Sequence, residues 1–145
     1  MSESDPLSDD YRADPETVRA TADLVDAVPA LRPILEEHVA YLDEILPHVV
    51  WAPFRHALVD FVERGDDVAV TSFLDVVEGL AASPNDEVRN LIGIIFLEDG
   101  VLLSGGREHA ALTSLVPRFG PATQALLAET KRHYDALVEA SRREP

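Results

Sequence analysis

The chain contains no cysteine, so disulfide bonds, thiolate zinc sites and cysteine catalysis are excluded. Basic residues are scarce: Lys131 is the only lysine, and 12 Lys and Arg stand against 27 Asp and Glu. So few cations form no basic stripe, which disfavours binding to nucleic acid or to an anionic membrane. Long apolar runs are also missing, since the longest, at residues 91–97, is far shorter than the roughly 20 residues that cross a bilayer. The first fourteen residues are acidic and lack the apolar stretch of a secretory signal, so we expect a cytoplasmic protein.

Negative charge is what the chain has in excess, and it is unevenly distributed. The formal net charge is −15, with 22 acidic and 6 basic residues in 1–100 but 5 acidic and 6 basic residues in 101–145. A strongly anionic protein repels nucleic acid and attracts cationic partners. Adaptation to high salt produces the same excess of acids. Two interpretations therefore remain open: an anionic binding face, or a solvated surface that binds nothing.

The 145 residues, 46% of them hydrophobic, are enough for one domain with its own core. Residues 1–13 are polar and aperiodic, and we interpret them as a disordered acidic tail. Residues 14–145 then form a single helical domain, because apolar residues recur three and four positions apart. The predicted fold class is all-α, with about seven antiparallel helices in a single bundle or a HEAT-like right-handed stack. The expected helices are 14–28, 33–46, 53–65, 66–80, 83–100, 107–116 and 120–141.

Capping residues predict several of these helix ends. Asp14 precedes a proline that suits the first helical turn, and Ser83 stands in the same position before another proline. Pro47 is expected to close one helix and Pro53 to open the next, with residues 49–51 as a connector. The remaining expected boundaries are Gly65 and Gly100 as helix ends and Asp66 or Asp67 as a cap.

Only one arrangement of histidine and acidic residues offers a metal site. His56 and Asp60 lie four residues apart and therefore on one helical face, and His48 is near them in sequence. The H-E-x-x-H and E-x-x-H motifs do not occur, so a solvated helix face is favoured and no metal or other cofactor is expected. Residues 100–107 lack the lysine of a phosphate loop, and no nucleophile motif is present. No catalytic residue is assigned, and an enzyme is not the favoured interpretation.

Exposed acidic residues are the candidate partner-binding residues, because helix 33–46 is expected to carry apolar residues on one face and acids on the other. His38 lies on the apolar face, where a core histidine with one hydrogen-bonded nitrogen is expected. Trp51 allows two interpretations: an anchor for a partner, or a side chain that fills the core between two helices. Together with Trp51, the partner-binding candidates are Glu36, Glu37, Asp43, Glu44, Asp66 and Asp67.

Three segments within residues 45–100 carry a resemblance to a known family. They are Leu46-Pro47-His48, the helix from Phe54 to Phe61, and the run from Glu87 to Glu98. This part of the chain resembles a family of uncharacterised small all-helical bacterial proteins, some of which behave as immunity proteins beside toxins. The resemblance implies a helical fold and no catalytic residues. The acidic N-terminal tail and the long basic-tipped last helix depart from that family's pattern.

The sequence thus predicts a non-catalytic acidic module that binds a basic protein, as an immunity protein or antitoxin binds a toxin. One alternative is a small helical metal-binding or catalytic protein that uses His48, His56 and Asp60. Another is a scaffold protein of a salt-adapted cytoplasm. The oligomeric state is left open.

Overall fold

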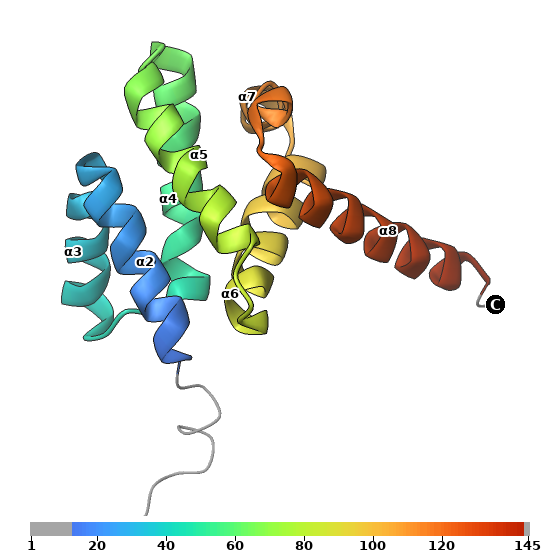
Figure 1. The fold of residues 1–145 in the computed structure, drawn as a ribbon, viewed down its shortest axis with the longest axis horizontal. Helices are drawn as coiled ribbons and strands as arrows, with labels where there is room; N and C mark the ends of the chain where they lie inside the picture. Colours follow the sequence, from blue (N-terminus) through green and yellow to red (C-terminus); the bar gives the residue numbers. More distant parts are fainter. Residues whose placement is uncertain (1–12, 144–145) are drawn as a thin grey trace, which may run out of the picture.

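The computed structural model describes residues 13–143, and every regular element in this range is helical, which confirms the all-α fold class. The helices follow one another along the longest axis of the molecule, from α3 and α2 at one end, through α4 and α5, to α8 at the other (Figure 1). Of the predicted tail at residues 1–13, all but Ala13 lies outside the described residues. The elements are α2 (Pro15–Ala27), η1 (Pro29–Leu31), α3 (Arg32–Leu42), α4 (Pro47–Arg64), α5 (Asp67–Ala81), α6 (Asp86–Asn90), η2 (Leu91–Leu102), α7 (Gly106–Thr113), η3 (Val116–Arg118) and α8 (Pro121–Arg143).

Local capping contacts confirm three predicted boundaries. The Asp14 carboxylate accepts a hydrogen bond from the Glu16 backbone N–H at 2.7 Å at the start of α2. Gly65 ends α4 in the left-handed conformation, with φ of 72°. Asp66 then caps α5 by accepting a hydrogen bond from the Ala69 N–H at 3.2 Å. Each of these caps involves residues close together in sequence, which is why the sequence alone predicts them.

The boundary between α3 and α4 differs from the prediction. Helix α3 ends at Leu42, four residues early, because Asp43 adopts a left-handed φ of 70° and closes it. Helix α4 begins at Pro47, so residues 49–51 are helical rather than a connector and Pro53 lies inside the helix. Proline is favourable in a first helical turn, as at Pro47. Pro53 is tolerated because it is exposed, and water can reach the carbonyl that loses its helical donor.

The start of α6 also differs from the prediction. Asn85, not Ser83, is the capping residue, and its side-chain oxygen accepts a hydrogen bond from the Val88 N–H at 3.0 Å. The Ser83 hydroxyl accepts one from the Asn85 N–H instead, at 3.0 Å. The helix is therefore capped by Asn85, two residues after Ser83, the cap that the sequence predicted.

The most apolar segment forms a π-helix, η2, in which most side chains are buried, whereas the sequence predicted an α-helix that stops at Gly100. Gly100 lies inside η2, and its missing side chain makes room for Arg55: a Cβ there would lie 2.6 Å from Arg55 Cδ. Despite the apolar character of η2, none of the helices within residues 13–143 is both long and apolar enough to cross a membrane.

Aromatic side chains form the centre of the core. Trp51 of α4 is 1% exposed and packs edge-on against Phe54 and Phe73, with ring centroids 6.0 and 6.2 Å away. Phe73 in turn lies 6.0 Å from Phe96 of η2. The Trp51 indole N–H donates a hydrogen bond to the Thr21 hydroxyl at 3.0 Å, so its polar atom is satisfied inside the core. Of its two interpretations, Trp51 therefore takes the core one, and a partner cannot reach it in this structure.

A carboxylate from α5 positions the start of α8. Glu78 accepts hydrogen bonds from the backbone N–H groups of Ala122 (2.8 Å) and Thr123 (2.9 Å) and from the Thr123 hydroxyl (2.7 Å). Gly120 leaves room for this contact, because a Cβ at that position would collide with the Glu78 carboxylate. Burial alone would raise the pKa of Glu78, but the three hydrogen bonds together outweigh burial and lower the pKa below its ordinary value. The charged form of Glu78 thus holds the N-terminus of α8 against α5.

Candidate partner-binding face

Helix α3 is attached to the body by one side only. Its apolar residues recur three and four positions apart and face the body, but they are only half-buried, and no residue of α3 is fully buried within the described chain. The half-buried apolar residues are Ile34, Leu35, Val39 and Leu42. The opposite side of α3 is therefore free to meet solvent or a partner.

That opposite side carries exposed acidic residues and an exposed tyrosine. The four predicted acids of α3 and the loop after it are all exposed. Tyr41 lies one helical turn after Glu37 and is 86% exposed. The sequence analysis missed Tyr41, although its position outside the apolar stripe was a usable signal for it. We call this surface the α3 face; it consists of Glu36, Glu37, Tyr41, Asp43 and Glu44.

The protein's own arginines neutralise acids elsewhere on the molecule. Each of the seven arginines in residues 13–120 forms an ion pair with a carboxylate, and none of these pairs includes an acid of the α3 face as far as the structure describes the chain. The pairs are Arg19–Glu16 (3.7 Å), Arg32–Asp26 (3.3 Å), Arg55–Glu108 (2.6 Å), Arg64–Asp66 (4.0 Å), Arg89–Asp86, Arg107–Glu63 (2.7 Å), Arg107–Asp60 (3.3 Å) and Arg118–Asp67 (3.0 Å). The carboxylates of the α3 face consequently form no ion pair among the described residues.

Asp66 and Asp67, the other two predicted acids, lie in a different environment. Asp66 caps α5 and is paired with Arg64, and Asp67 is paired with Arg118. Both carboxylates are exposed, yet their charge is partly neutralised before any partner arrives. They lie at the α4–α5 turn and not on α3, so the six predicted acids do not form one cluster of equivalent residues.

A side-chain contact fastens the loop that carries Asp43 and Glu44. The ring nitrogen Nε2 of His38 accepts a hydrogen bond from the Leu46 backbone N–H at 2.9 Å. Burial lowers the pKa of His38, which favours the neutral ring that this hydrogen bond requires. His38 is half-buried with one hydrogen-bonded nitrogen, close to the predicted core histidine, and it holds the end of α3 against the start of α4.

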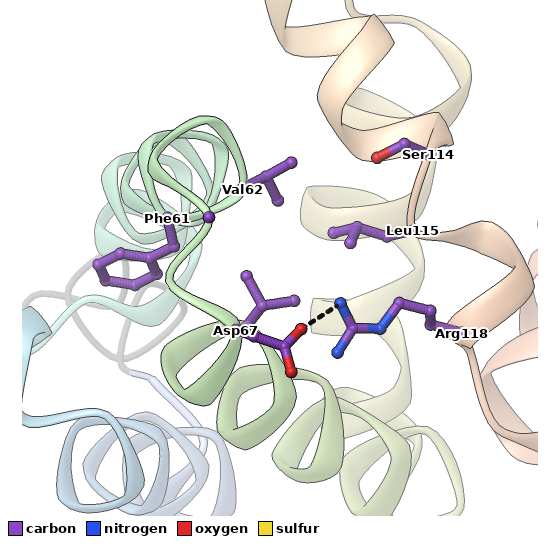
Figure 2. Close-up of a pocket in the computed structure, with 8 residues that line it drawn as sticks. Phe61, Val62, Asp67, Ser114, Leu115 and Arg118 are labelled. Atoms are coloured by element: carbon purple, nitrogen blue, oxygen red, sulfur yellow. Dashed lines mark ion pairs between the residues drawn. The ribbon is translucent and has the colours of Figure 1, made fainter.

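Figure 2 shows a shallow pocket of about 160 Å³ beside Asp67. Apolar side chains of α4, α5 and the segment after α7 line it, and the Asp67–Arg118 ion pair lies at its edge. Arg118 also donates a hydrogen bond to the Thr71 hydroxyl at 2.8 Å. The pocket is large enough for one apolar side chain, but the polar groups at its edge already bind one another.

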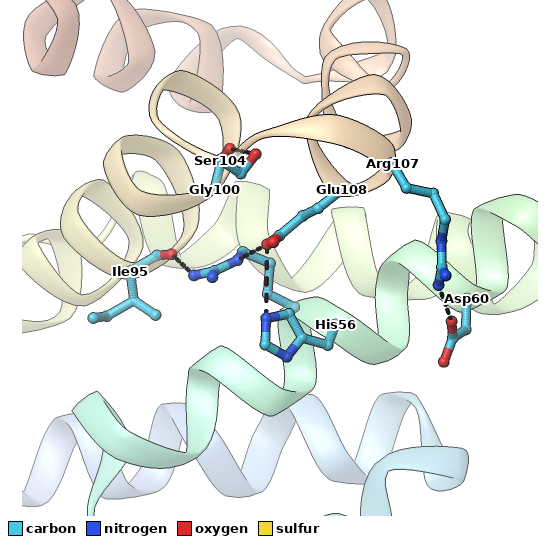
Figure 3. A network of polar contacts seen from close by, with 8 residues as sticks. His56, Asp60, Ile95, Gly100, Ser104, Arg107 and Glu108 are labelled. Carbon is cyan, nitrogen blue, oxygen red and sulfur yellow. Dashed lines mark hydrogen bonds and ion pairs between the residues drawn. The ribbon is translucent and has the colours of Figure 1, made fainter.

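His48, His56 and Asp60 do not come together. Between residues 13 and 143 there is no group of three or more His, Asp or Glu side chains that could hold a metal ion. Asp60 binds Arg107 instead, and His56 Nε2 lies 3.9 Å from a Glu108 carboxylate oxygen (Figure 3). The spacing of His56 and Asp60 places both on one side of α4, but Asp60 is paired with Arg107, and Glu108, the acid beside His56, is paired with Arg55.

The same view shows an ion pair that the sequence could not reveal. Arg55 is 8% exposed and donates hydrogen bonds to Glu108 of α7 at 2.6 Å and to the Ile95 carbonyl of η2 at 2.5 Å (Figure 3). Arg55 and Glu108 are 53 positions apart in sequence. These contacts join α4, η2 and α7. Because Arg55 and Glu108 bind each other in a largely buried position, we interpret them as a structural ion pair.

Comparison with known proteins gives a family but no activity. No curated protein and no solved structure matches the chain. A family model described as a domain of unknown function, DUF7674, matches residues 21–135, from within α2 to within α8. The match includes the whole α3 face and covers well over half of the chain. The chain therefore belongs to the DUF7674 family.

Proposed function

We propose that this chain is a non-catalytic binding module whose α3 face masks a basic protein, in the manner of an immunity protein or antitoxin that binds a toxin. A bacterial origin and a cytoplasmic location are parts of the same proposal. One observation carries it: the α3 face has four exposed carboxylates beside the exposed Tyr41, and none of these carboxylates has an ion-pair partner among the described residues. Asp66 and Asp67 are peripheral in this proposal because each already faces an arginine.

The carboxylates and the tyrosine of the α3 face contribute to binding in different ways. Uncompensated carboxylates attract a cationic surface over a distance of about one Debye length, roughly 8–10 Å at physiological salt, and so raise the association rate. A solvent-exposed tyrosine supplies a large, rigid contact area, and tyrosine is enriched among residues that dominate binding energy. Tyr41 therefore replaces the buried Trp51 as the aromatic residue that a partner can contact.

The test compares two triple variants of equal net charge. Glu36, Glu37 and Glu44 are changed to Lys in one variant; in the control, Lys replaces Asp75, Glu87 and Asp99, which are exposed and form no ion pair with other described residues. Proteins from the native host that bind the wild-type chain are identified, and the association rate of each basic one is measured at low salt. We expect reversal of the α3 face to slow association about tenfold or more, whereas the control stays close to the wild type.

Changing Tyr41 to Ala is expected to increase the dissociation rate about tenfold or more, with little effect on the association rate. Equal association rates for the two triple variants would refute the α3 face as the binding surface. Folding that strengthens steeply with added salt, in a chain that retains no basic protein, would instead support the scaffold of a salt-adapted cytoplasm.

A further inference from the structure

The last helix extends well beyond the body that supports it. At about 1.5 Å per residue, the 23 residues of α8 span about 35 Å. Leu126 and Leu127 pack against the core, but after them no apolar residue of α8 does so within the described chain. Figure 1 shows the C-terminal half of α8 projecting from the end of the molecule. We call residues 131–143 the arm.

An unsupported helix of this length is marginally stable in water, since isolated helices shorter than about 12–15 residues form only partially. The arm nevertheless carries an apolar stripe, because Tyr134, Leu137 and Val138 lie on one side at spacings of three and four. Leu137 is 54% exposed, and the other two are half-buried. A helix in contact with this stripe would bury the apolar surface and stabilise the arm.

The charge of the arm is opposite to that of the α3 face. The arm has four basic residues against two acidic ones, whereas the α3 face has four acidic residues and no basic one. Lys131 and Arg132 form no ion pair with any residue in 13–143. Each surface also exposes a large apolar residue, Leu137 on the arm and Tyr41 on the α3 face. The two surfaces thus complement each other in charge and both offer apolar area.

The two surfaces lie too far apart to meet within one molecule, since α3 and the arm are at opposite ends of the longest axis (Figure 1). A two-fold axis across the middle of that length brings the arm of each copy to the end of the other copy that carries α3. Pairing of two arms with each other is less favourable, because each arm has four basic residues against two acidic ones and the two arms repel each other.

We propose that the chain forms a two-fold dimer in which the arm of each copy docks on the α3 face of the other. The contact is isologous and closes after two copies, so no open chain of molecules results. The dimer does not depend on the basic partner proposed above. In the dimer the arm covers the α3 face, so the basic partner must displace the arm to bind there.

Analytical ultracentrifugation of the full chain at low salt tests the dimer with two complementary variants. An arm variant carries Lys131→Glu and Arg142→Glu, the two basic residues that lie beside Val138 on the helix, and a face variant carries Glu36→Lys and Glu37→Lys. Each variant alone places like charges at both contacts, so we expect its dimer dissociation constant to rise by about tenfold or more. An equimolar mixture has opposite charges at both contacts of the heterodimer, so mixing should restore dimers.

The control variant, Glu87→Lys with Asp99→Lys, changes the net charge as the face variant does and should dimerise like the wild type. Circular dichroism checks that every variant folds. A monomeric wild-type chain at low salt, or variants that remain monomeric when mixed, would overturn the proposal. The arm variant keeps the α3 face intact, so it still binds a basic partner if the proposed function holds; loss of dimer formation and loss of partner binding are thus distinguishable.

Discussion

Replacement of Glu78 by Gln tests how much the contact between the Glu78 carboxylate and the start of α8 contributes to stability. The carboxylate accepts three hydrogen bonds at 2.7–2.9 Å, all from the first residues of α8. Hydrogen bonds to a charged group contribute about 1.5–3 kcal/mol, and loss of a helix N-cap costs about 0.5–2 kcal/mol. Gln keeps one acceptor oxygen but directs an NH₂ group at the remaining donors. We therefore expect Glu78→Gln to lower the free energy of unfolding by about 2 kcal/mol at pH 7.

The pH dependence of this difference has a definite sign. The pKa of Glu78 is lower in the folded protein than its ordinary value of about 4.5. The unfolded chain therefore binds the proton more tightly, and acid favours unfolding. The stabilisation is fully present above about pH 4.5 and is lost as the pH falls through the folded-state pKa. The wild type and Glu78→Gln should accordingly converge in stability in acid.

Urea unfolding between about pH 3 and pH 7 measures both effects, provided that the m-value is unchanged. Asp75→Asn is the matched control, because Asp75 lies one turn before Glu78 on α5, is exposed, and accepts no side-chain hydrogen bond among the described residues. A Glu78→Gln variant within about 0.3 kcal/mol of the wild type at pH 7 would show that the contact contributes nothing net. A difference that stays constant with pH would show that the charged form is not the one that caps α8.

Two further predictions concern the other buried polar contacts. Arg55→Met leaves Glu108 without its partner and is expected to lower the free energy of unfolding by about 3 kcal/mol. The double variant with Glu108→Leu should lose less than the sum of the two single variants. Additive losses in urea unfolding would contradict the ion pair. The lowered pKa of His38 means that its contribution is present above the ordinary value of 6.5 and is lost as the pH falls through the folded-state pKa. Hydrogen-exchange protection of the Leu46 amide should therefore decrease on acidification, and protection that does not change with pH would exclude the His38 contact.

Local interactions are the part of this fold that sequence reasoning predicts well. Asp14 and Asp66 cap helices through residues two and three positions away, and Gly65 ends a helix through its own φ. Where two residues offered the same chemistry, the prediction was wrong: Pro47 and Pro53 both suit a first turn, and α4 begins at Pro47, with Pro53 inside the helix. Helix number and approximate position were therefore predictable, and individual boundaries were less so.

Contacts between distant residues were not predictable, for a physical reason. Glu78 and Thr123 are 45 positions apart, and neither the acid nor the hydroxyl group is unusual in its own helix. The π-helical form of η2 is equally invisible, because its apolar residues also fit an α-helical period. The acids of α3 were found because their exposure follows from helix periodicity alone. Tyr41 obeys the same rule, because it lies outside the apolar stripe of α3 and is exposed.

The placement of the arginines bears on why the chain is so acidic. Acidic residues that serve only to bind water at high salt need not lie in any particular position relative to the basic residues. Here, within the described chain, the seven arginines of the body pair with carboxylates on several elements but not with those of the α3 face, nor with the isolated exposed acids Asp75, Glu87 and Asp99. Lys131 and Arg132 at the far end form no ion pair among residues 13–143. The acidic α3 face and the basic arm therefore lie at opposite ends of the longest axis, since α3 and the C-terminal half of α8 do (Figure 1). Such a molecule orients an approaching charged protein before contact, and salt weakens that orientation as the Debye length shortens. A binding protein should therefore lose association rate with added salt while it keeps its fold, whereas a salt-adapted scaffold should gain stability under the same change.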